Sequence, residues 1–191
     1  MSATAPLVSI GLPVYNGERY LDSTIESILG QTYADIELVI SDNGSTDDTE
    51  TICRTWADKD ARVRYHRSDT NRGAAWNYNR TFELSSGEYF KWAAHDDLLA
   101  PRYVEACLEG FREGPSDLVL VYPSTTFIGG DGEVLSGLRD EDLDLMGESP
   151  SARLRLLLHR VAFCNAVFGL IRRDVLATTK LIVAYDSSDI L

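Results

Sequence analysis

Apolar runs of strand length alternate with segments of helical periodicity through the first half of the chain, and this alternation constrains the fold more than any other feature. The strand-like runs lie at residues 7–13, 36–42, 63–67 and 87–95, and the helical segments between them lie at 18–31, 47–58 and 73–86. Strands that are apolar on both faces and are joined by helices are typical of a parallel sheet covered by helices. The sequence therefore predicts an α/β fold with a mainly parallel sheet.

The second half of the chain continues this rhythm and then departs from it. A helix is predicted at 101–114, a buried strand at 117–124, a hairpin at 126–137 around Gly129–Gly132, a helix at 151–163 and a strand running into a helix at 166–176. The acidic stretch 138–150 is predicted to be a loop. We expect a single domain spanning 1–191, in which residues 98–191 add a smaller lobe to residues 1–97.

Composition narrows the class of partner. The chain has 191 residues, 44% of them hydrophobic, and a formal net charge of −12, whereas proteins that bind nucleic acid usually present a basic face. The three cysteines are widely spaced, which favours reduced, buried thiols and a cytoplasmic location. The N-terminus does not resemble a secretory signal, and no apolar run is long enough to span a bilayer. Association with the inner face of the membrane is left open.

Polar residues and glycines follow each predicted strand of the first half. The four groups are Pro13–Gly17, Ser41–Ser45, Asn71–Gly73 and His95–Asp97. In open α/β sheets, ligands bind beyond the carboxyl ends of the strands, so these groups mark the predicted site. Each group alone also fits a structural interpretation. Ser45 fits the N-cap of the following helix, and the two aspartates fit the cap of a helix that begins near Pro101.

Asp96 and Asp97 pose the sharpest chemical question, because they end an apolar run. A charge at the mouth of a buried strand needs a helix N-terminus, a basic side chain or a metal ion as a partner. Carboxylates after two strands, together with the Arg72–Gly73 turn, suit a nucleotide diphosphate held around Mg²⁺, which takes one or two carboxylates plus phosphates. The P-loop and dinucleotide-binding glycine patterns are both missing from the sequence.

Taken as a set, these motifs resemble the family 2 glycosyltransferases, which have the GT-A fold. The segments that carry the resemblance are PVYNG, SDNGSTDDT, NRG and GEYF followed by the aspartate pair, and it is strong over about the first 125 residues. The resemblance implies an inverting transferase with a Rossmann-like sheet that uses a nucleotide-sugar donor. It also implies a divalent metal, Mn²⁺ or Mg²⁺, and a hydroxyl acceptor, which is a glycan, a lipid-linked group or a small molecule.

The resemblance also implies roles for individual residues. The pocket for the base and ribose would be lined by Pro13, Val14, Tyr15 and Glu18. Asp42 would bind the base, most often uracil, and Asn71, Arg72 and Gly73 would lie under the nucleotide. Asp96 would face the ribose or the sugar, and Asp97 would coordinate the metal. Asn79 matches the asparagine of an Arg-Asn pair in many relatives and is taken as a further substrate-binding residue, whereas Tyr78 replaces the arginine.

The catalytic base implied by the resemblance is a carboxylate in the second half of the chain. Asp189 matches its position best, Asp186 is the second candidate, and Asp174 fits a helix cap instead. The chain departs from the family pattern at His95, where many relatives carry an acid. It also stops two residues after Asp189, where relatives usually continue with helices over the acceptor, so we expect the acceptor side to be truncated.

Three functions remain open at this point. The first is a metal-dependent inverting glycosyltransferase with a nucleoside diphosphate donor, expected to be UDP-linked. The second is a domain that binds a nucleotide-sugar without turnover. The third is a sugar nucleotidyltransferase, which is disfavoured because the loop Pro13–Gly17 contains one glycine and no lysine. The sequence does not name the sugar, the acceptor or the oligomeric state.

Overall fold

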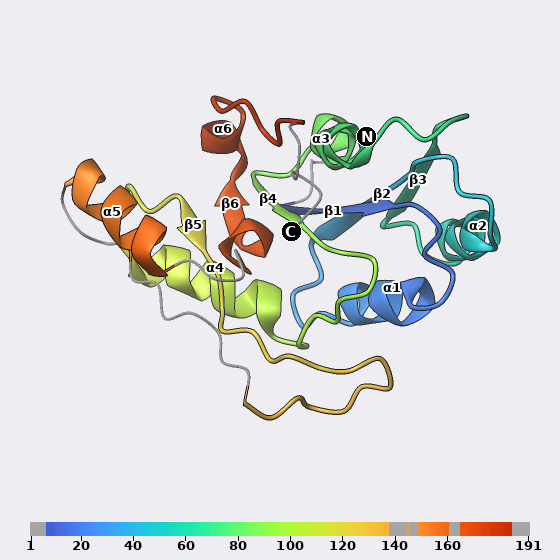
Figure 1. Ribbon diagram of the computed structural model, residues 1–191, viewed down its shortest axis with the longest axis horizontal. Helices are drawn as coiled ribbons and strands as arrows, with labels where there is room; N and C mark the ends of the chain where they lie inside the picture. The colour runs from blue at the N-terminus through green and yellow to red at the C-terminus, as the bar shows by residue number, and fades with distance from the viewer. Residues whose placement is uncertain (1–6, 138–144, 146–148, 161–164, 185–191) are drawn as a thin grey trace.

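The computed structural model describes residues 7–137, 145, 149–160 and 165–184. Its centre is a six-stranded sheet with the strand order β3-β2-β1-β4-β6-β5 (Figure 1). The first four strands along the chain are mutually parallel, with β1 between β2 and β4. The predicted α/β fold with a mainly parallel sheet is therefore confirmed.

The parallel half follows the predicted alternation closely. Its elements are β1 (Val8–Val14), α1 (Leu21–Leu29), β2 (Ile36–Asp42), α2 (Thr49–Lys59), β3 (Val63–Arg67), α3 (Ala74–Leu84) and β4 (Tyr89–Trp92). The strands β2 and β3 have the predicted bounds, whereas β4 ends earlier than the apolar run suggested. In β1 and β2 every residue is buried, as expected for strands with helices on both faces.

The second half of the chain adds two strands to the sheet, next to β4. It contains α4 (Tyr103–Glu113), β5 (Leu120–Val121), α5 (Pro150–Arg160), the 3₁₀ helix η1 (Asn165–Phe168), β6 (Leu170–Arg172) and α6 (Arg173–Leu176). β6 pairs antiparallel with both β4 and β5. The strand predicted at 117–124 is present as β5, but its predicted length and burial were wrong, because β5 has two residues and both are only half-buried at the sheet edge. The predicted hairpin is confirmed by an antiparallel bridge between Ile128 and Val134.

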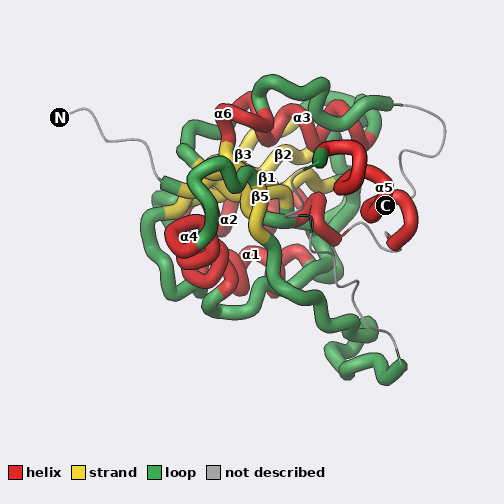
Figure 2. Tube along the Cα trace, turned by 90° about the vertical axis from the view of Figure 1, so that its left-hand side faces the viewer, coloured by secondary structure: helices red, strands yellow, loops and turns green. Residues whose placement is uncertain are grey.

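Helices cover both faces of the sheet, and each face has its own apolar core. One core joins β1 and β2 to α1, α2 and α4, which lie below the sheet in Figure 1. The other core joins β4 and β6 to α3 and α6 above the sheet through Phe82, Phe90, Trp92, Ile171 and Leu176. Figure 2 shows the same arrangement from the side, with the strands enclosed between helices. The layers fix the strands rigidly, so that their carboxyl ends are held in register.

Two findings bear on compartment and membrane contact. Cys53 and Cys107 are buried free thiols, as predicted, while Cys164 lies outside the described residues. Burial raises the pKa of the Cys53 thiol to about 12, so this side chain behaves as an inert core residue. Within the described parts of the chain, no helix is both long enough and apolar enough to cross a membrane.

Lys91 is a buried charge in the sheet that the apolar pattern of its strand did not predict. It lies on β4 with 2% of its surface exposed, and its Nζ donates a hydrogen bond to the carbonyl of Trp92 at 2.7 Å. The ammonium also sits 4.8 Å from the centre of the Tyr103 ring. Burial lowers the pKa of Lys91 to about 8, which means that the folded protein holds this charge at an energetic cost.

We predict that Lys91→Met increases the free energy of unfolding at pH 7, because it removes a buried charge. The unfolded chain keeps the Lys91 proton up to the usual pKa of 10.5, whereas the folded chain loses it near pH 8. The stability of the unmodified protein should therefore rise between these pH values, by at most about 3 kcal/mol. Urea unfolding at pH 7 and pH 10 measures the difference.

The exposed Lys180 provides the matched control. Lys180→Met should leave the pH dependence of the free energy of unfolding unchanged. Lys91→Met should abolish the part of that dependence which falls between pH 8 and 10.5. An identical pH dependence in the unmodified protein and in Lys91→Met would show that Lys91 does not carry the predicted cost.

Candidate functional site

The candidate site lies at the edge of the sheet where the parallel strands β1, β2 and β4 end. The register pairs Val14 at the end of β1 with Asp42 at the end of β2, so the loops that follow them start side by side. β4 lies on the other side of β1 and leads into His95–Asp97. The polar groups that the sequence places after separate strands therefore meet at one edge, as expected for a parallel sheet.

Hydrogen bonds fasten the loop after β1 to the loop after β2. The backbone N–H groups of Asn16 and Gly17 donate to the hydroxyls of Ser45 and Thr49, both at 2.9 Å. In return, the side-chain oxygen of Asn16 accepts from the Thr46 N–H at 2.8 Å. Each loop thus satisfies backbone donors of the other, which orders both of them without a ligand.

One prediction is wrong in this region, and one predicted pocket residue has a further contact. Ser45 does not cap α2, because the helix begins at Thr49 and Asp48 occupies the N-cap position, while the Ser45 hydroxyl serves Asn16 instead. The carboxylate of Glu18, predicted to line the nucleotide pocket, accepts a hydrogen bond from the Asp48 N–H at 3.0 Å. Glu18 therefore also belongs to the network that joins the two loops.

Asp42 is a buried carboxylate with partners on three sides. Its Oδ1 accepts from the Ser45 N–H at 2.8 Å, and its Oδ2 accepts from the Tyr65 hydroxyl at 2.8 Å. Arg67 forms an ion pair with the same Oδ2 at 3.3 Å. None of the Asp42 side chain is exposed, so contact with a nucleotide base stays a prediction, and the contacts in the structure are structural. The hydrogen bond to Asp42 adds to burial in raising the pKa of Tyr65.

Asn43 holds the Asn71–Gly73 turn against the end of β2. Its side-chain nitrogen donates to the Asn71 side-chain oxygen at 2.9 Å and to the Gly73 carbonyl at 3.1 Å, and its oxygen accepts from the Arg72 N–H at 2.9 Å. The Arg72 guanidinium then lies 4.2 Å from the centre of the Trp76 ring. The sequence analysis placed Asn43 only within the group Ser41–Ser45, and its contacts were missed because Asn71 is distant along the chain.

The remaining predicted substrate residues differ in accessibility. Pro13 and Val14 are buried within β1, whereas Tyr15 is 42% exposed beside the loops. Asn79 donates to the Ile182 carbonyl at 2.9 Å and accepts from the Ile182 N–H at 3.0 Å. Both polar atoms of the Asn79 amide therefore bind the segment after α6. Of these four residues, Tyr15 has the side chain that a ligand can reach.

Asp96 and Asp97 line a cavity of about 520 Å³ beyond the end of β4. Tyr20 and Ser23, at the start of α1, form a second wall, and the hairpin residues from Thr126 to Gly132 form a third. In the described parts of the chain, neither carboxylate has a hydrogen-bond or ion-pair partner. The volume falls within the range of small-molecule sites in proteins, and its polar groups converge on the two aspartates.

The environment of Asp97 favours a cation. The carboxylate faces the cavity, yet protein surrounds it enough that desolvation raises its pKa, and the adjacent Asp96 raises it further. Lys91 and His95 oppose this shift. Among the described residues, no group of three or more metal-ligating side chains is assembled. A hard cation bound here would therefore need oxygen ligands from a substrate as well, which is the usual arrangement for Mg²⁺ with phosphates.

Tyr78 is a further residue at this site that the sequence analysis did not assign. It lies on α3, and its ring packs against Trp92 with the ring centres 6.3 Å apart. Burial raises the pKa of its hydroxyl, and the charges of Asp96 and Asp97 raise it again. Tyr78 therefore places a neutral phenol near the two carboxylates.

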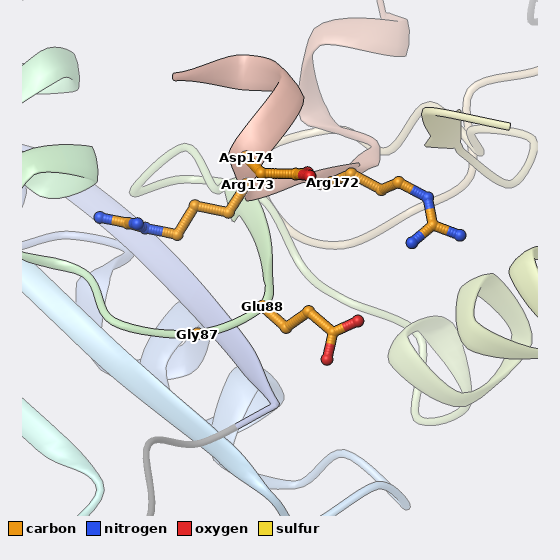
Figure 3. A pocket seen from close by; sticks show the side chains of 5 residues that line it. All are labelled: Gly87, Glu88, Arg172, Arg173 and Asp174. Atoms are coloured by element: carbon orange, nitrogen blue, oxygen red, sulfur yellow. The ribbon is translucent and has the colours of Figure 1, made fainter. Parts of the chain in front are cut away.

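A second cavity, of about 260 Å³, lies at the opposite end of β4 from the two aspartates. It is lined by Gly87, Glu88 and Arg172–Asp174, and Figure 3 shows the two arginine side chains pointing away from each other. Arg172 donates to the Leu118 carbonyl at 2.9 Å, and Arg173 donates to the Ser85 carbonyl at 3.1 Å. Both guanidinium groups bind backbone carbonyls, so these arginines hold neighbouring segments of the fold together.

The predicted catalytic bases Asp189 and Asp186 lie outside the described residues. Asp174, interpreted as a cap, lies in the first turn of α6 and accepts a hydrogen bond from the Val175 N–H at 2.8 Å. The structure thus brings Asp96 and Asp97 together with the loops after β1 and β2.

Comparison with known proteins decides the family. The sequence profile described as "Glycosyl transferase family 2" matches residues 9–179. The chain belongs to glycosyl transferase family 2. An uncharacterized glycosyltransferase of Rickettsia typhi is 39% identical over 118 residues, which cover 62% of this chain and 36% of that protein. The chondroitin synthase of Escherichia coli is 40% identical over 131 residues, covering 69% of this chain and 19% of the synthase. The family member described here thus spans about a third or less of the length of these curated relatives.

Solved structures show the same GT-A fold. A mannosyltransferase from Pyrobaculum calidifontis in complex with GDP-Man and Mn²⁺ superposes with a TM-score of 0.65 and 18% identity, covering 95% of this chain and 48% of that one. S. aureus TarS 1-349 in complex with UDP-GlcNAc gives a TM-score of 0.61 at 18% identity, covering 89% of this chain and 46% of that one. At this level of identity the likeness establishes the fold alone.

We predict that Asp42→Asn lowers the free energy of unfolding by about 2 kcal/mol, because it removes a buried charge that accepts hydrogen bonds from Tyr65 and Ser45, while Arg67 keeps its ion pair with Glu50. Denaturant unfolding measures the change. Asp69→Asn alters an exposed acid near the same edge and should change stability little. Equal stability of Asp42→Asn and the unmodified protein would contradict the structural role of Asp42.

Proposed function

We propose that this chain is the catalytic domain of a metal-dependent, inverting glycosyltransferase that moves a sugar from a nucleoside diphosphate to a hydroxyl acceptor. The observation that carries the proposal is the pair Asp96 and Asp97, which line a 520 Å³ cavity and whose carboxylates have no hydrogen-bond or ion-pair partner among the residues that the structure describes. The neighbours with GDP-Man and Mn²⁺ and with UDP-GlcNAc support a nucleotide-sugar donor. UDP-sugars are the first donors to test.

The arrangement of the loops supports a nucleotide beside the cavity. Tyr15 and the turn Asn71–Gly73 are exposed, and Asn43 fixes the position of that turn. A nucleotide held there would direct its diphosphate toward Asp97 and its sugar into the cavity. Because the loops are already hydrogen-bonded to each other, little ordering entropy would be lost when the donor binds.

The proposed reaction is a direct displacement at the anomeric carbon. The acceptor oxygen forms a bond to the anomeric carbon of the sugar as the bond from that carbon to the diphosphate breaks, which inverts the configuration. A carboxylate, proposed to be Asp189, takes the proton of the acceptor hydroxyl. Asp97, with Asp96 beside it, would hold Mn²⁺ or Mg²⁺ on the diphosphate. The bound cation would supply positive charge that stabilises the departing nucleoside diphosphate.

We predict that UDP or GDP binds only with Mn²⁺ or Mg²⁺ present, and that Asp97→Asn weakens this binding by about tenfold or more, which is about 1.4 kcal/mol. The reason is that the variant removes a charged oxygen ligand of the metal. Calorimetric titrations with Mn²⁺ and with EDTA make the measurement, and Asp58→Asn, on the distant helix α2, is the matched control. Equal nucleotide affinity in Mn²⁺ and EDTA would refute the metal role.

We predict that Asp189→Asn abolishes sugar transfer while donor binding survives, because the change removes basicity without changing shape. Transfer from a labelled nucleotide-sugar and calorimetric donor binding are compared in the same preparation, with Asp186→Asn as the paired variant. Near-normal transfer by Asp189→Asn would reject this base. Donor binding without transfer or hydrolysis in the unmodified chain would instead favour a non-catalytic binding domain.

A further inference from the structure

The cavity beyond Asp97 has a wall that no predicted site residue explains. This wall is the hairpin Phe127–Leu135, the yellow-orange loop at the bottom of Figure 1, which projects from the body in Figure 2. The residues that line the cavity include Asp96 and Asp97 but none of the residues from Pro13 to Tyr15 or from Asn71 to Gly73. The cavity therefore extends from the two aspartates away from the loops proposed to hold the nucleotide.

Backbone hydrogen bonds give the hairpin a defined shape. The Leu135 N–H donates to the Phe127 carbonyl at 2.9 Å, and the Gly129 N–H donates to the Glu133 carbonyl at 2.8 Å. Gly132 has a φ of +83°, which closes the turn in a conformation that other residues rarely adopt. The tip of the hairpin thus has the order needed of a binding wall.

Close packing seats this tip against the start of α1. A Cβ atom on Gly130 would lie 3.0 Å from the hydroxyl of Tyr20, so only glycine fits there without a shift. The Arg19 guanidinium covers the Tyr20 ring at 4.8 Å from its centre. Asp131, the next residue, lines the cavity from the hairpin side, and Asp96 and Asp97 line it from the segment after β4.

The chemistry of the lining is one-sided. It contains three carboxylates, Asp96, Asp97 and Asp131, and the Arg19 guanidinium comes within 3.6 Å of the Cβ position of Gly130. A divalent cation would offset the charge of Asp96 and Asp97, and Arg19 would offset one further charge, but the diphosphate adds negative charge, so the sum over the cavity stays negative. Leu98 and Ile128 add apolar surface, with 52% and 38% of each residue exposed. Carboxylates that accept from hydroxyls, next to apolar surface, suit an uncharged sugar ring and repel an anionic group.

We propose that the hairpin Phe127–Leu135 forms the acceptor wall of the cavity, and that Asp131 there binds the hydroxyls of an uncharged sugar. The inference rests on the proposed glycosyl transfer and narrows its acceptor class. An acceptor whose reacting end carries a phosphate or a uronate would meet like charge from Asp131. Asp131 is a binding residue, so its loss should act on the acceptor KM and leave the donor site intact.

The experiment compares two acceptor probes that differ in one group, p-nitrophenyl β-glucoside and p-nitrophenyl β-glucuronide. The donor is the UDP- or GDP-sugar that the chain hydrolyses fastest with Mn²⁺, and hydrolysis without acceptor is recorded for each variant. We expect about tenfold higher kcat/KM for the glucoside. Asp131→Asn should raise the glucoside KM about tenfold with donor hydrolysis unchanged, and Asp131→Lys should remove the preference against the glucuronide. Asp117→Asn, at an exposed acid before β5, should behave as the unmodified chain.

The outcomes separate this inference from the proposed function. Three outcomes would overturn the acceptor wall while the chain still hydrolyses the donor: equal use of both glycosides, transfer to neither glycoside, or an unchanged glucoside KM in Asp131→Asn. Each of them leaves the proposed glycosyl transfer standing. Failure of the unmodified chain to bind or hydrolyse any donor overturns both. A glucoside preference that Asp131→Asn weakens and Asp131→Lys removes supports the inference.

Discussion

The buried carboxylate of Asp42 is the interaction on which the carboxyl edge of the sheet depends. It links β2 to β3 through Tyr65 and Arg67 and to the loop after β2 through the Ser45 backbone. Asn43, the next residue, hydrogen-bonds the Asn71–Gly73 turn and so joins that turn to the end of β2. A buried charge is stable only when it is paired and hydrogen-bonded, so the position of Asp42 dictates where its partners lie.

Asp97 has the same functional group as Asp42 and the opposite environment. Asp42 has all its contacts within the protein, whereas Asp97 faces a cavity and has no partner among the described residues. Protein close to Asp97 and the charge of Asp96 both raise its pKa, which means that the folded chain holds an electrostatic cost at that point. Such a cost at a cavity is characteristic of sites that bind a cation or a substrate, and it supports the proposed metal site.

The second half of the structure gives the site its shape. β6 pairs antiparallel with β4, and its continuation into α6 leads the chain back over α3, where Ile182 binds the amide of Asn79. The hairpin approaches α1 from the other side and closes the cavity through Gly130 and Tyr20. A family 2 domain of this kind thus combines a rigid parallel half with a cavity whose walls come from distant segments.

The sequence by itself determined the parallel half of the fold, the family and the edge at which the site lies. Hydrophobic periodicity is a local property, so β2 and β3 were predicted with their observed bounds, and the carboxyl ends of parallel strands necessarily share one edge. Only the tertiary structure decided that Asp42 is buried among its partners whereas Asp97 lines a cavity. It also decided that Asn79 binds Ile182 and that Asp131 lines the same cavity as Asp97. These outcomes depend on contacts between residues far apart along the chain, which no local pattern encodes.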